Sequence, residues 1–383
     1  MKESWEYKKL GEVCDVRDGT HDSPQYRITG IPLITSKNLI NGKIDFSNVN
    51  YISEIDAANI NKRSKVDIGD IIMPMIGTIG NPIINNSCNY FCIKNVALIK
   101  FLNNFISNKF VYYILSSELF INYVKKNNKG GTQKFLALSL IRELPIPVPP
   151  LSEQKRIVEE LDLISGIIEK QKQQLKELDT LAQSIFYYMF GDPVTNEKGW
   201  EVKKMKEVAP SKEFIGEITK VNNKYWLLNL DKVESNTGKI LSKDYYDITE
   251  IGSSTITFDE SNILYSKLRP YLNKVVIPYD TGYGTSELVP LKPKYEILNR
   301  IFLAHLLRSK PFVSYISVKV AGAKMPRVSM EDLRNFKVIL PPLALQNLFA
   351  SKIEAIEKQK EAITKSIEET QKLFDYTMDK YFG

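Results

Sequence analysis

The chain has 383 residues, of which 43% are hydrophobic and 25% charged, and its formal net charge is +7. This composition allows sizeable buried cores and is not typical of a disordered chain, and the length suits two domains. The excess of Lys and Arg is compatible with an anionic partner but does not require one. The charged opening segment and the lack of an apolar run of about 18 residues predict a cytoplasmic protein with no membrane segment.

Residues 1–150 predict a first mixed domain of α/β or α+β class. Short runs rich in Ile, Val and Leu, bounded by Gly, Asn, Asp or Pro, predict strands at 31–34, 70–75 and 96–101. Polar loops interrupt these runs. Their candidate DNA-contacting residues are Arg17, Thr20, His21, Lys37, Asn38, Thr132, Gln133 and Lys134.

Residues 151–191 predict a long helix that starts after Pro149 and Pro150. Apolar residues follow one another at alternating spacings of three and four, the pattern of a heptad seam. Ser152 is expected to cap this helix, and Gly191 stands where a C-terminal glycine belongs. The seam residues are Leu161, Ile164, Ile168, Leu175, Leu178 and Ile185.

Residues 192–342 predict a second domain of the same mixed class. Strand candidates are 226–230, 262–265 and 288–291. Polar loops again lie between them. Their candidate DNA-contacting residues are Lys220, Asn222, Lys267, Arg269, Tyr271, Lys324 and Arg327.

Residues 343–383 predict a second long helix, which follows Pro341 and Pro342 and ends at Gly383. At about 39 residues and about 1.5 Å per residue, each helix should be roughly 58 Å long. The flanking Glu, Lys and Gln residues indicate solvated faces. The seam residues of this helix are Ile353, Ile356, Ile363, Ile367 and Phe374.

The sequence contains an internal duplication. Pro149-Pro150-Leu151 returns as Pro341-Pro342-Leu343 and Phe190-Gly191 as Phe382-Gly383, both displaced by 192 residues. Two seams in one chain can pair with each other, which we favour over a homodimeric coiled coil. The predicted architecture is therefore two tandem α/β domains separated by two long antiparallel coiled-coil helices, with pseudo-twofold symmetry.

The loop residues have the chemistry of DNA contacts. Arg, Lys, Asn and Gln can bind phosphates or hydrogen-bond to base edges, and Tyr can stack or pack. Polar loops are solvated by default, so each loop alone is weak evidence. His21 lies in such a loop, without a neighbouring nucleophile that would make it a general base.

No motif for catalysis or for a metal stands out. The sequence has neither a phosphate-binding loop nor an Asn-Pro-Pro-aromatic site for a flipped base. Cys14, Cys88 and Cys92 are too few for a zinc site and are expected to be ordinary buried or strand thiols. His305 is expected to be a packed core residue. We therefore predict no catalytic residue and no metal, although a nuclease with dispersed Asp and Glu residues stays open.

Several stretches resemble the specificity subunits of Type I restriction-modification systems. They are Asp18-Gly19-Thr20-His21-Asp22-Ser23-Pro24, residues 131–134 (Gly-Thr-Gln-Lys), residues 144–158 and residues 267–272. The Pro-Pro-Leu-x-x-Gln entry into a long helix is the most specific of these. The second copy departs from the family pattern at Ala344-Leu345-Gln346-Asn347 and at Lys324-Met325-Pro326-Arg327.

The resemblance implies a non-catalytic subunit with two target-recognition domains, each reading one part of a split site on double-stranded DNA. The helices would set the spacing and dock two methyltransferase subunits, which would bind S-adenosylmethionine and methylate adenine. Restriction/translocase subunits would complete the complex. The alternative is a coiled-coil scaffold with two protein-binding heads, whose interaction with DNA would be absent or insensitive to salt.

Overall fold

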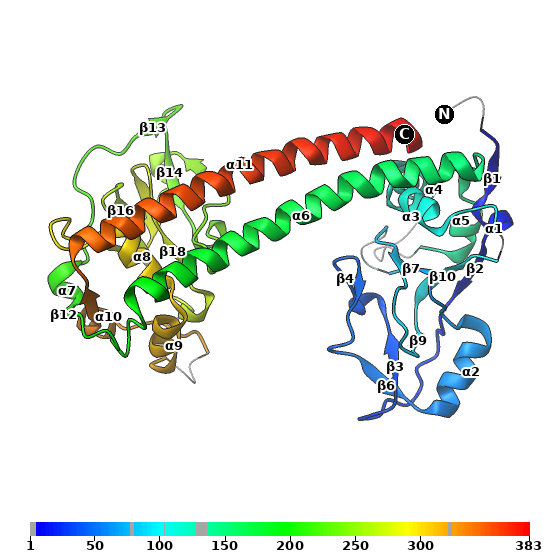
Figure 1. The fold of residues 1–383 in the computed structure, drawn as a ribbon, viewed down its shortest axis with the longest axis horizontal. Helices are drawn as coiled ribbons and strands as arrows, with labels where there is room; N and C mark the ends of the chain where they lie inside the picture. Colours follow the sequence, from blue (N-terminus) through cyan, green and yellow to red (C-terminus); the bar gives the residue numbers. More distant parts are fainter. Residues whose placement is uncertain (1–4, 77–79, 103, 128–135, 321–323) are drawn as a thin grey trace. The chain divides into compact units, whose positions relative to one another are not determined.

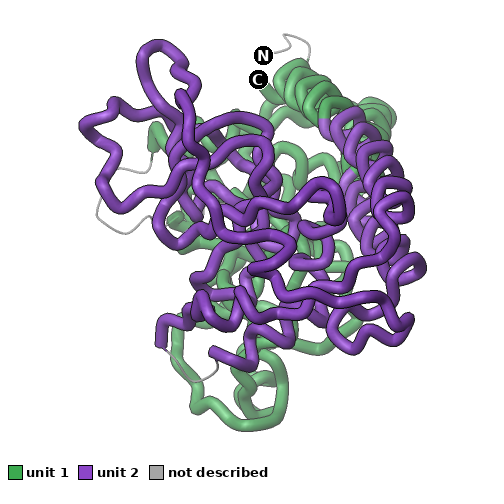
Figure 2. Tube along the Cα trace, turned by 90° about the vertical axis from the view of Figure 1, so that its left-hand side faces the viewer, with its two compact units in different colours: residues 1–171, 365–383 green, residues 172–364 purple. Residues whose placement is uncertain are grey.

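The computed structural model describes residues 5–76, 80–102, 104–127, 136–320 and 324–383. The chain forms two compact units, which Figure 2 distinguishes by colour. Unit 1 consists of residues 1–171 and 365–383, and unit 2 of residues 172–364. The division falls inside both long helices, so each unit includes about half of each helix, whereas the sequence-based segmentation treated the helices as separate parts.

Unit 1 contains an antiparallel sheet in the order β2-β10-β7-β8 and a smaller sheet in the order β6-β3-β9, in which β3 and β9 are parallel. The pairs β1 with β11 and β4 with β5 complete its strands. The strands are β1 (Tyr7–Lys9), β2 (Asp15–Asp18), β3 (Ile31–Ile34), β4 (Leu39–Ile40), β5 (Lys43–Ile44), β6 (Asn50–Ile52), β7 (Ile71–Pro74), β8 (Ile83–Ile84), β9 (Cys92–Ile93), β10 (Val96–Lys100) and β11 (Pro145–Pro147). Its helices are α1 (Leu10–Val13), α2 (Glu54–Ser64), the 3-10 turn η1 (Ser36–Asn38), α3 (Asn108–Ser116), α4 (Glu118–Asn127) and α5 (Leu138–Arg142).

Unit 2 repeats the main strands and helices of unit 1 but differs in several shorter elements. Its sheets are β13-β14-β19-β16, with β15 also paired to β14, then β18-β17-β20, and the pair β12 with β21. The strands are β12 (Glu201–Lys204), β13 (Lys220–Val221), β14 (Lys224–Leu228), β15 (Asp244–Tyr246), β16 (Thr255–Phe258), β17 (Ile263–Ser266), β18 (Val275–Val276), β19 (Gly282–Thr285), β20 (Leu288–Leu291) and β21 (Lys337–Leu340). The helices are α7 (Met205–Val208), η2 (Leu230–Lys232), η3 (Ile248–Glu250), η4 (Pro270–Leu272), α8 (Arg300–Arg308), α9 (Lys310–Val318) and α10 (Met330–Asn335).

The 192-residue displacement found in the sequence also relates the elements of the two units. Adding 192 to the bounds of α3 gives those of α8, and the strand order β10-β7-β8 returns as β20-β17-β18. The six strands predicted from the sequence are all present, with ends shifted by at most two residues. The largest difference lies after β6, where unit 1 has helix α2 and unit 2 has strand β16 (Figure 1). In addition, β2, β4 and β5 have no equivalent strand in unit 2, and β13 has none in unit 1. The scaffold is therefore duplicated, but these segments are not.

The central strands β7 and β17 are buried along their whole length because both faces of each sheet are covered. In β7, Ile71 and Met73 join the main core of unit 1, whereas Ile72 joins a second cluster on the other face. In β17, Ile263 and Tyr265 likewise join one cluster and Leu264 the other. Side chains alternate across a strand, so a strand buried on both faces reads as an unbroken apolar run.

The two long helices are α6 (Leu151–Phe190) and α11 (Leu343–Phe382), each of 40 residues. They run antiparallel in each unit. In unit 1 the Gln171 amide donates to Ser366 Oγ at 2.7 Å, while Tyr381 OH donates to Glu160 at 2.7 Å. In unit 2, Lys360 contacts Asp179 at 2.8 Å.

Every predicted seam residue is at least half-buried, while most neighbouring positions are exposed. The fully buried ones are Leu161, Ile164, Ile168, Ile353 and Ile356, and the half-buried ones are Leu175, Leu178, Ile185, Ile363, Ile367 and Phe374. Towards the helix ends, however, the seam packs into the cores of the units rather than only against the other helix. Leu161 belongs to the core of unit 1, and Ile353 to that of unit 2.

Aromatic residues anchor the helix ends and were not part of the predicted seam. In unit 2, Phe190 packs edge-on against Phe302 of α8, with ring centroids 4.7 Å apart, and against Phe349 of α11 at 5.4 Å. In unit 1, Phe382 packs against Phe110 of α3 at 5.4 Å. Each unit therefore receives the end of one long helix and the beginning of the other in a single apolar core.

A buried glutamine locks the start of each long helix. Gln154, which is fully buried, accepts from the backbone N–H of Ser107 and donates to the carbonyls of Phe105 and Pro149 at 3.0 and 2.8 Å. Gln346 makes the same three contacts, 192 residues later, with Asn299, Ile297 and Pro341. The glutamine of the Pro-Pro-Leu-x-x-Gln stretch thus ties the proline entry to the loop before α3 or α8.

The expected cap at Ser152 is wrong, because α6 already begins at Leu151 and Ser152 lies inside its first turn. The Pro150 carbonyl instead accepts the first helical bonds, from the N–H groups of Glu153 and Gln154. Gly191 does end α6: its φ is +74°, a value that favours glycine, and its N–H donates to the Tyr187 carbonyl at 2.9 Å.

The three cysteines are free thiols in different surroundings. Cys14 and Cys92 are buried, and desolvation raises the pKa of both thiols to about 12. Cys88 is exposed and lies outside the strands, which corrects the expectation for that residue.

Within the described ranges, none of the helices has the length and apolar character needed to cross a bilayer.

Candidate nucleic-acid interface

In unit 1, the buried carboxylate of Asp18 at the end of β2 organises the first polar loop. It accepts a hydrogen bond from His21 Nε2 at 2.7 Å and forms an ion pair with Arg63, from the end of α2. The other ring nitrogen of His21 contacts Asn95 Oδ1 at 2.9 Å. The side chains of His21 and Arg63 are 55% and 67% exposed, whereas that of Asp18 is only 8% exposed. The cluster therefore turns its basic groups towards solvent.

This arrangement favours the charged form of His21. The hydrogen bonds to Asp18 and then to Asn95 raise its pKa above the ordinary value, and they outweigh partial burial and the repulsion from Arg63. Thr20 lies in the same loop, where its N–H donates to the Ile93 carbonyl. Lys94, which is buried, donates through Nζ to Ser23 Oγ at 2.6 Å. Asp18 therefore holds two basic side chains, His21 and Arg63, while Lys94 fixes the loop at Ser23.

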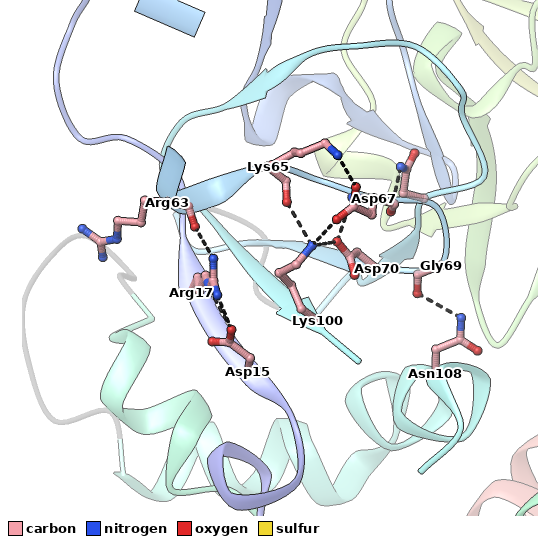
Figure 3. A network of polar contacts seen from close by, with 10 residues as sticks. Asp15, Arg17, Arg63, Lys65, Asp67, Gly69, Asp70, Lys100 and Asn108 are labelled. Atoms are coloured by element: carbon pink, nitrogen blue, oxygen red, sulfur yellow. Dashed lines mark hydrogen bonds and ion pairs between the residues drawn. The ribbon is translucent and has the colours of Figure 1, made fainter. Parts of the chain in front are cut away.

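A second polar network fixes the chain between α2 and β7 (Figure 3). Lys100 Nζ donates to Asp67 at 2.9 Å, to Asp70 at 2.5 Å and to the Lys65 carbonyl at 3.0 Å. The hydrogen bond from Lys100, and then that from Lys65, lowers the pKa of Asp67. Because this network holds the segment just after Arg63, it helps to keep that arginine near Asp18.

Two of the predicted DNA-contacting residues in unit 1 serve structural roles. Asn38 is buried, and its amide holds Thr35 and the carbonyls of Asp45 and Asn48, so its prediction as a DNA contact is corrected. Arg17 is only half-buried, but its guanidinium is bound to Asp15 and to the Arg63 carbonyl (Figure 3). Neither side chain is arranged to reach an external ligand.

Five candidate DNA-contacting residues of unit 1 remain, and the structure describes two of them. Lys37 is exposed in η1, and Thr20 is half-buried in the loop with His21. Thr132, Gln133 and Lys134 lie outside the described residues.

In unit 2, Lys220 and Asn222 lie on a hairpin. The strands β13 and β14 are joined by Asn222 and Asn223, whose φ values are +53° and +62°, as a two-residue hairpin turn requires. Asn tolerates this left-handed backbone better than most residues. Lys220 lies over the ring of Tyr225 at 5.4 Å, and both it and Asn222 are exposed. The hairpin therefore presents polar groups on a defined backbone.

The other five predictions in unit 2 come together, although 50 residues or more separate their two segments. We call this surface the Arg269 loop pair, which consists of residues 267–273 and 324–328. The Arg269 N–H donates to the Pro326 carbonyl at 2.8 Å, and the Val328 N–H donates to the Lys267 carbonyl at 2.9 Å. Arg269, Tyr271, Lys324 and Arg327 are exposed on these loops and Lys267 is half-buried.

Arg327 is held by an acid that the sequence did not suggest. Its Nε donates to Glu287 Oε1 at 2.9 Å, from the turn between β19 and β20. Glu287 lies 192 residues after Asn95, which contacts His21 in unit 1. The same turn of the duplicated scaffold thus holds a different basic side chain in each unit. Arg63, Asn95 and Glu287 were all missed, because only the fold brings them to the loops.

His305, expected to be a packed core residue, is half-buried in α8. It packs edge-on against Phe349 at 5.2 Å and lines a cavity of about 140 Å³ with Arg308 and Lys360. Desolvation, followed by repulsion from Arg308 and Lys360, lowers its pKa to about 3. In the described part of the chain, no cluster of three or more His, Cys, Asp or Glu side chains is placed to bind a metal.

Comparison with known proteins agrees with this duplicated arrangement. The family model described as "Type I restriction modification DNA specificity domain" matches twice, at residues 2–179 and 197–372. The EcoBI specificity subunit of a type I restriction enzyme from Escherichia coli is 31% identical over 96% of this chain and 82% of its own length. The MjaIX specificity subunit from Methanocaldococcus jannaschii is 23% identical over 93% of this chain and 87% of its own length.

The fold has a counterpart among solved structures. The S subunit of a Type-I restriction-modification system from M. genitalium aligns with 99% of this chain and 96% of its own, with a TM-score of 0.56 at 13% identity. The expected fold class is confirmed, and the relatives are specificity subunits, which have a recognition role rather than a catalytic one. Two copies of the domain model cover most of the sequence, so this chain belongs to the Type I restriction-modification DNA specificity family.

Proposed function

We propose that this chain is the specificity subunit of a Type I restriction-modification complex and reads a double-stranded DNA target in two separate parts, one by each unit. The observation that carries the proposal is the duplication itself. Each copy of the DNA specificity domain lies largely in a unit with its own exposed basic loops. Basic side chains on loops supply the phosphate and base-edge contacts on which DNA binding depends.

The differences between the units support two distinct half-sites. Helix α2 in unit 1 supplies Arg63, whereas unit 2 has strand β16 in that position. At equivalent turns, Asn95 holds His21 and Glu287 holds Arg327. Base readout depends on which donors and acceptors face the groove of the DNA. Two units with the same fold but different loop side chains should therefore recognise different base sequences.

The long helices would separate the half-sites and dock two methyltransferase subunits. Exposed apolar side chains on them, such as Leu163, Leu181, Leu348 and Leu373, are suited to contact a protein partner. The methyltransferase subunits would bind S-adenosylmethionine and transfer its methyl group to adenine. Restriction/translocase subunits would complete the assembly, which would act in the cytoplasm.

The proposal is tested by mapping methylated adenines in cells that express this chain with its methyltransferase partner. We expect a split motif, with two short defined sequences separated by a fixed number of unspecified bases. The control is the same methyltransferase expressed without this chain, which should leave the motif unmethylated. A single continuous motif, or the same motif in the control, would contradict the proposal.

A second prediction concerns pH. Since Asp18 and Asn95 raise the pKa of His21, its charge is fully present below about pH 6.5 and disappears as pH rises through the elevated pKa. Both ring nitrogens of His21 are already hydrogen-bonded, so it can act on a phosphate only through its charge. If it makes such an electrostatic contact, affinity for the target duplex should fall by roughly threefold to tenfold as the pH rises through the pKa of His21. His21→Gln should abolish this dependence, and Asn95→Ala should move it to lower pH. Equal pH profiles for His21→Gln and the unmodified chain would refute the contact.

A further inference from the structure

The Arg269 loop pair contains two arginines whose surroundings differ. Arg327 donates through Nε to Glu287, whose side chain is 22% exposed, and is itself 48% exposed. Arg269 is exposed on a backbone with φ of +50°, and in the described part of the chain no acidic side chain is paired with it. One arginine is therefore partly neutralised and oriented, and the other keeps its full charge.

Arg327 contacts Glu287 through Nε, so the contact does not engage the other two guanidinium nitrogens, Nη1 and Nη2. The described residues offer these two nitrogens no hydrogen-bond acceptor. Glu287 Oε2 is buried and has no hydrogen-bond partner in the described ranges, while Oε1 of the same carboxylate accepts from Arg327. Holding one side of a guanidinium fixes the direction of its remaining donors.

We propose that Arg327 reads a guanine in the half-site of unit 2, that Glu287 is the positioning residue that aims it, and that Arg269 binds the DNA backbone. This inference rests on the proposed function. A guanidinium can donate in parallel to O6 and N7 of guanine, two acceptors on a neutral base. The carboxylate beside Arg327 weakens its attraction to a phosphate but leaves this geometric match intact. The unneutralised Arg269 suits a phosphate instead.

The backbone of the loops supports the same division. The Arg269 N–H donates to the Pro326 carbonyl, and Leu268 pairs with Arg327 in an isolated bridge, so the two arginines are carried on joined segments. A positive φ at a residue other than glycine costs free energy, and such strain is concentrated at binding sites. A phosphate contact at Arg269 would fix the register in which Arg327 meets its base.

The experiment uses the full chain with its methyltransferase partner and the duplex identified by methylation mapping. Competition binding compares this duplex with versions in which each guanine of the unit 2 half-site is replaced by 7-deazaguanine, which lacks N7. We expect one such replacement to weaken binding, and Arg327→Ala to weaken binding to the unmodified duplex by about tenfold while making binding insensitive to that replacement.

Arg269→Ala is the matched control. It should weaken binding to all duplexes by a similar factor and lower the slope of log affinity against log salt by about one, with base preference retained. Glu287→Gln should keep the acceptor for Nε and part of the preference, but bind non-specific DNA more tightly, because a negative charge is lost. Glu287→Ala should lose the preference for guanine at that position alone, which a merely destabilising change would not do.

The outcomes separate the two proposals. If the unmodified complex fails to bind the split duplex, the proposed function is wrong. If it binds normally but tolerates 7-deazaguanine at every position, or if Arg327→Ala behaves like Arg269→Ala, the guanine contact is wrong and the proposed function stands.

Discussion

Replacing Gln346 by Ala is expected to lower the free energy of unfolding of unit 2 by about 3 kcal/mol or more. The side chain is fully buried and makes three hydrogen bonds, to the backbone of Ile297, Asn299 and Pro341. Its removal leaves two carbonyls and one N–H without partners in the interior, and each such group costs about 1–3 kcal/mol. Gln154→Ala should have the same effect on unit 1.

Urea denaturation of the full chain measures this prediction. The controls are Gln359→Ala, an exposed position of α11, and Gln173→Ala, an exposed position of α6, which should each change stability by less than about 0.5 kcal/mol. They remove a glutamine from the same helices without opening the interior. If Gln346→Ala lay within the range of these controls, the locking role of the buried glutamines would be refuted.

Lengthening both long helices by one heptad is expected to lengthen the unspecified spacer of the DNA motif and leave both half-site sequences unchanged. The insertions belong after residue 171 in α6 and after residue 364 in α11, at the boundary between the units. Seven residues add about 10 Å of helix. They also preserve the heptad pattern, so the antiparallel seam can still form.

Methylation mapping reads out this change directly. The control is a heptad inserted in α6 alone, which puts its seam out of register with α11 and should sharply reduce methylation. Altered half-site sequences with an unchanged spacer would contradict the view that the helices set the spacing and the units set the sequence.

The sequence was most informative where the pattern is periodic or repeated. Alternating spacings of three and four predicted both 40-residue helices and a seam in which every named residue is at least half-buried, from Leu161 to Phe374. The predicted cap at the start of the first long helix was wrong, because Ser152 lies inside α6. The pattern also missed Phe190 and Phe382 as anchors, because their partners Phe302 and Phe110 are distant in sequence.

The candidate interface was harder to predict, because exposed and buried polar residues look alike in a sequence. Asn38 has a side chain that could contact DNA, yet it is buried in unit 1, where its amide donates to the Asn48 carbonyl. Arg63 lies in a helix that no pattern marked as functional, yet it pairs with Asp18 beside His21. A side chain's availability depends on which neighbours satisfy its donors and acceptors, and those neighbours come from other strands and helices.

The sequence by itself determined that the protein is duplicated, that each copy is a mixed α/β domain leading into a long helix, and that it resembles a known family of DNA specificity subunits. These features are local or repeated, so periodicity and offset reveal them. Only the tertiary structure decided that the two segments of the Arg269 loop pair meet, that Asn95 contacts His21 while Glu287 holds Arg327, and that each unit includes part of both long helices. Those facts depend on contacts between residues far apart in the chain, which packing and hydrogen bonding select.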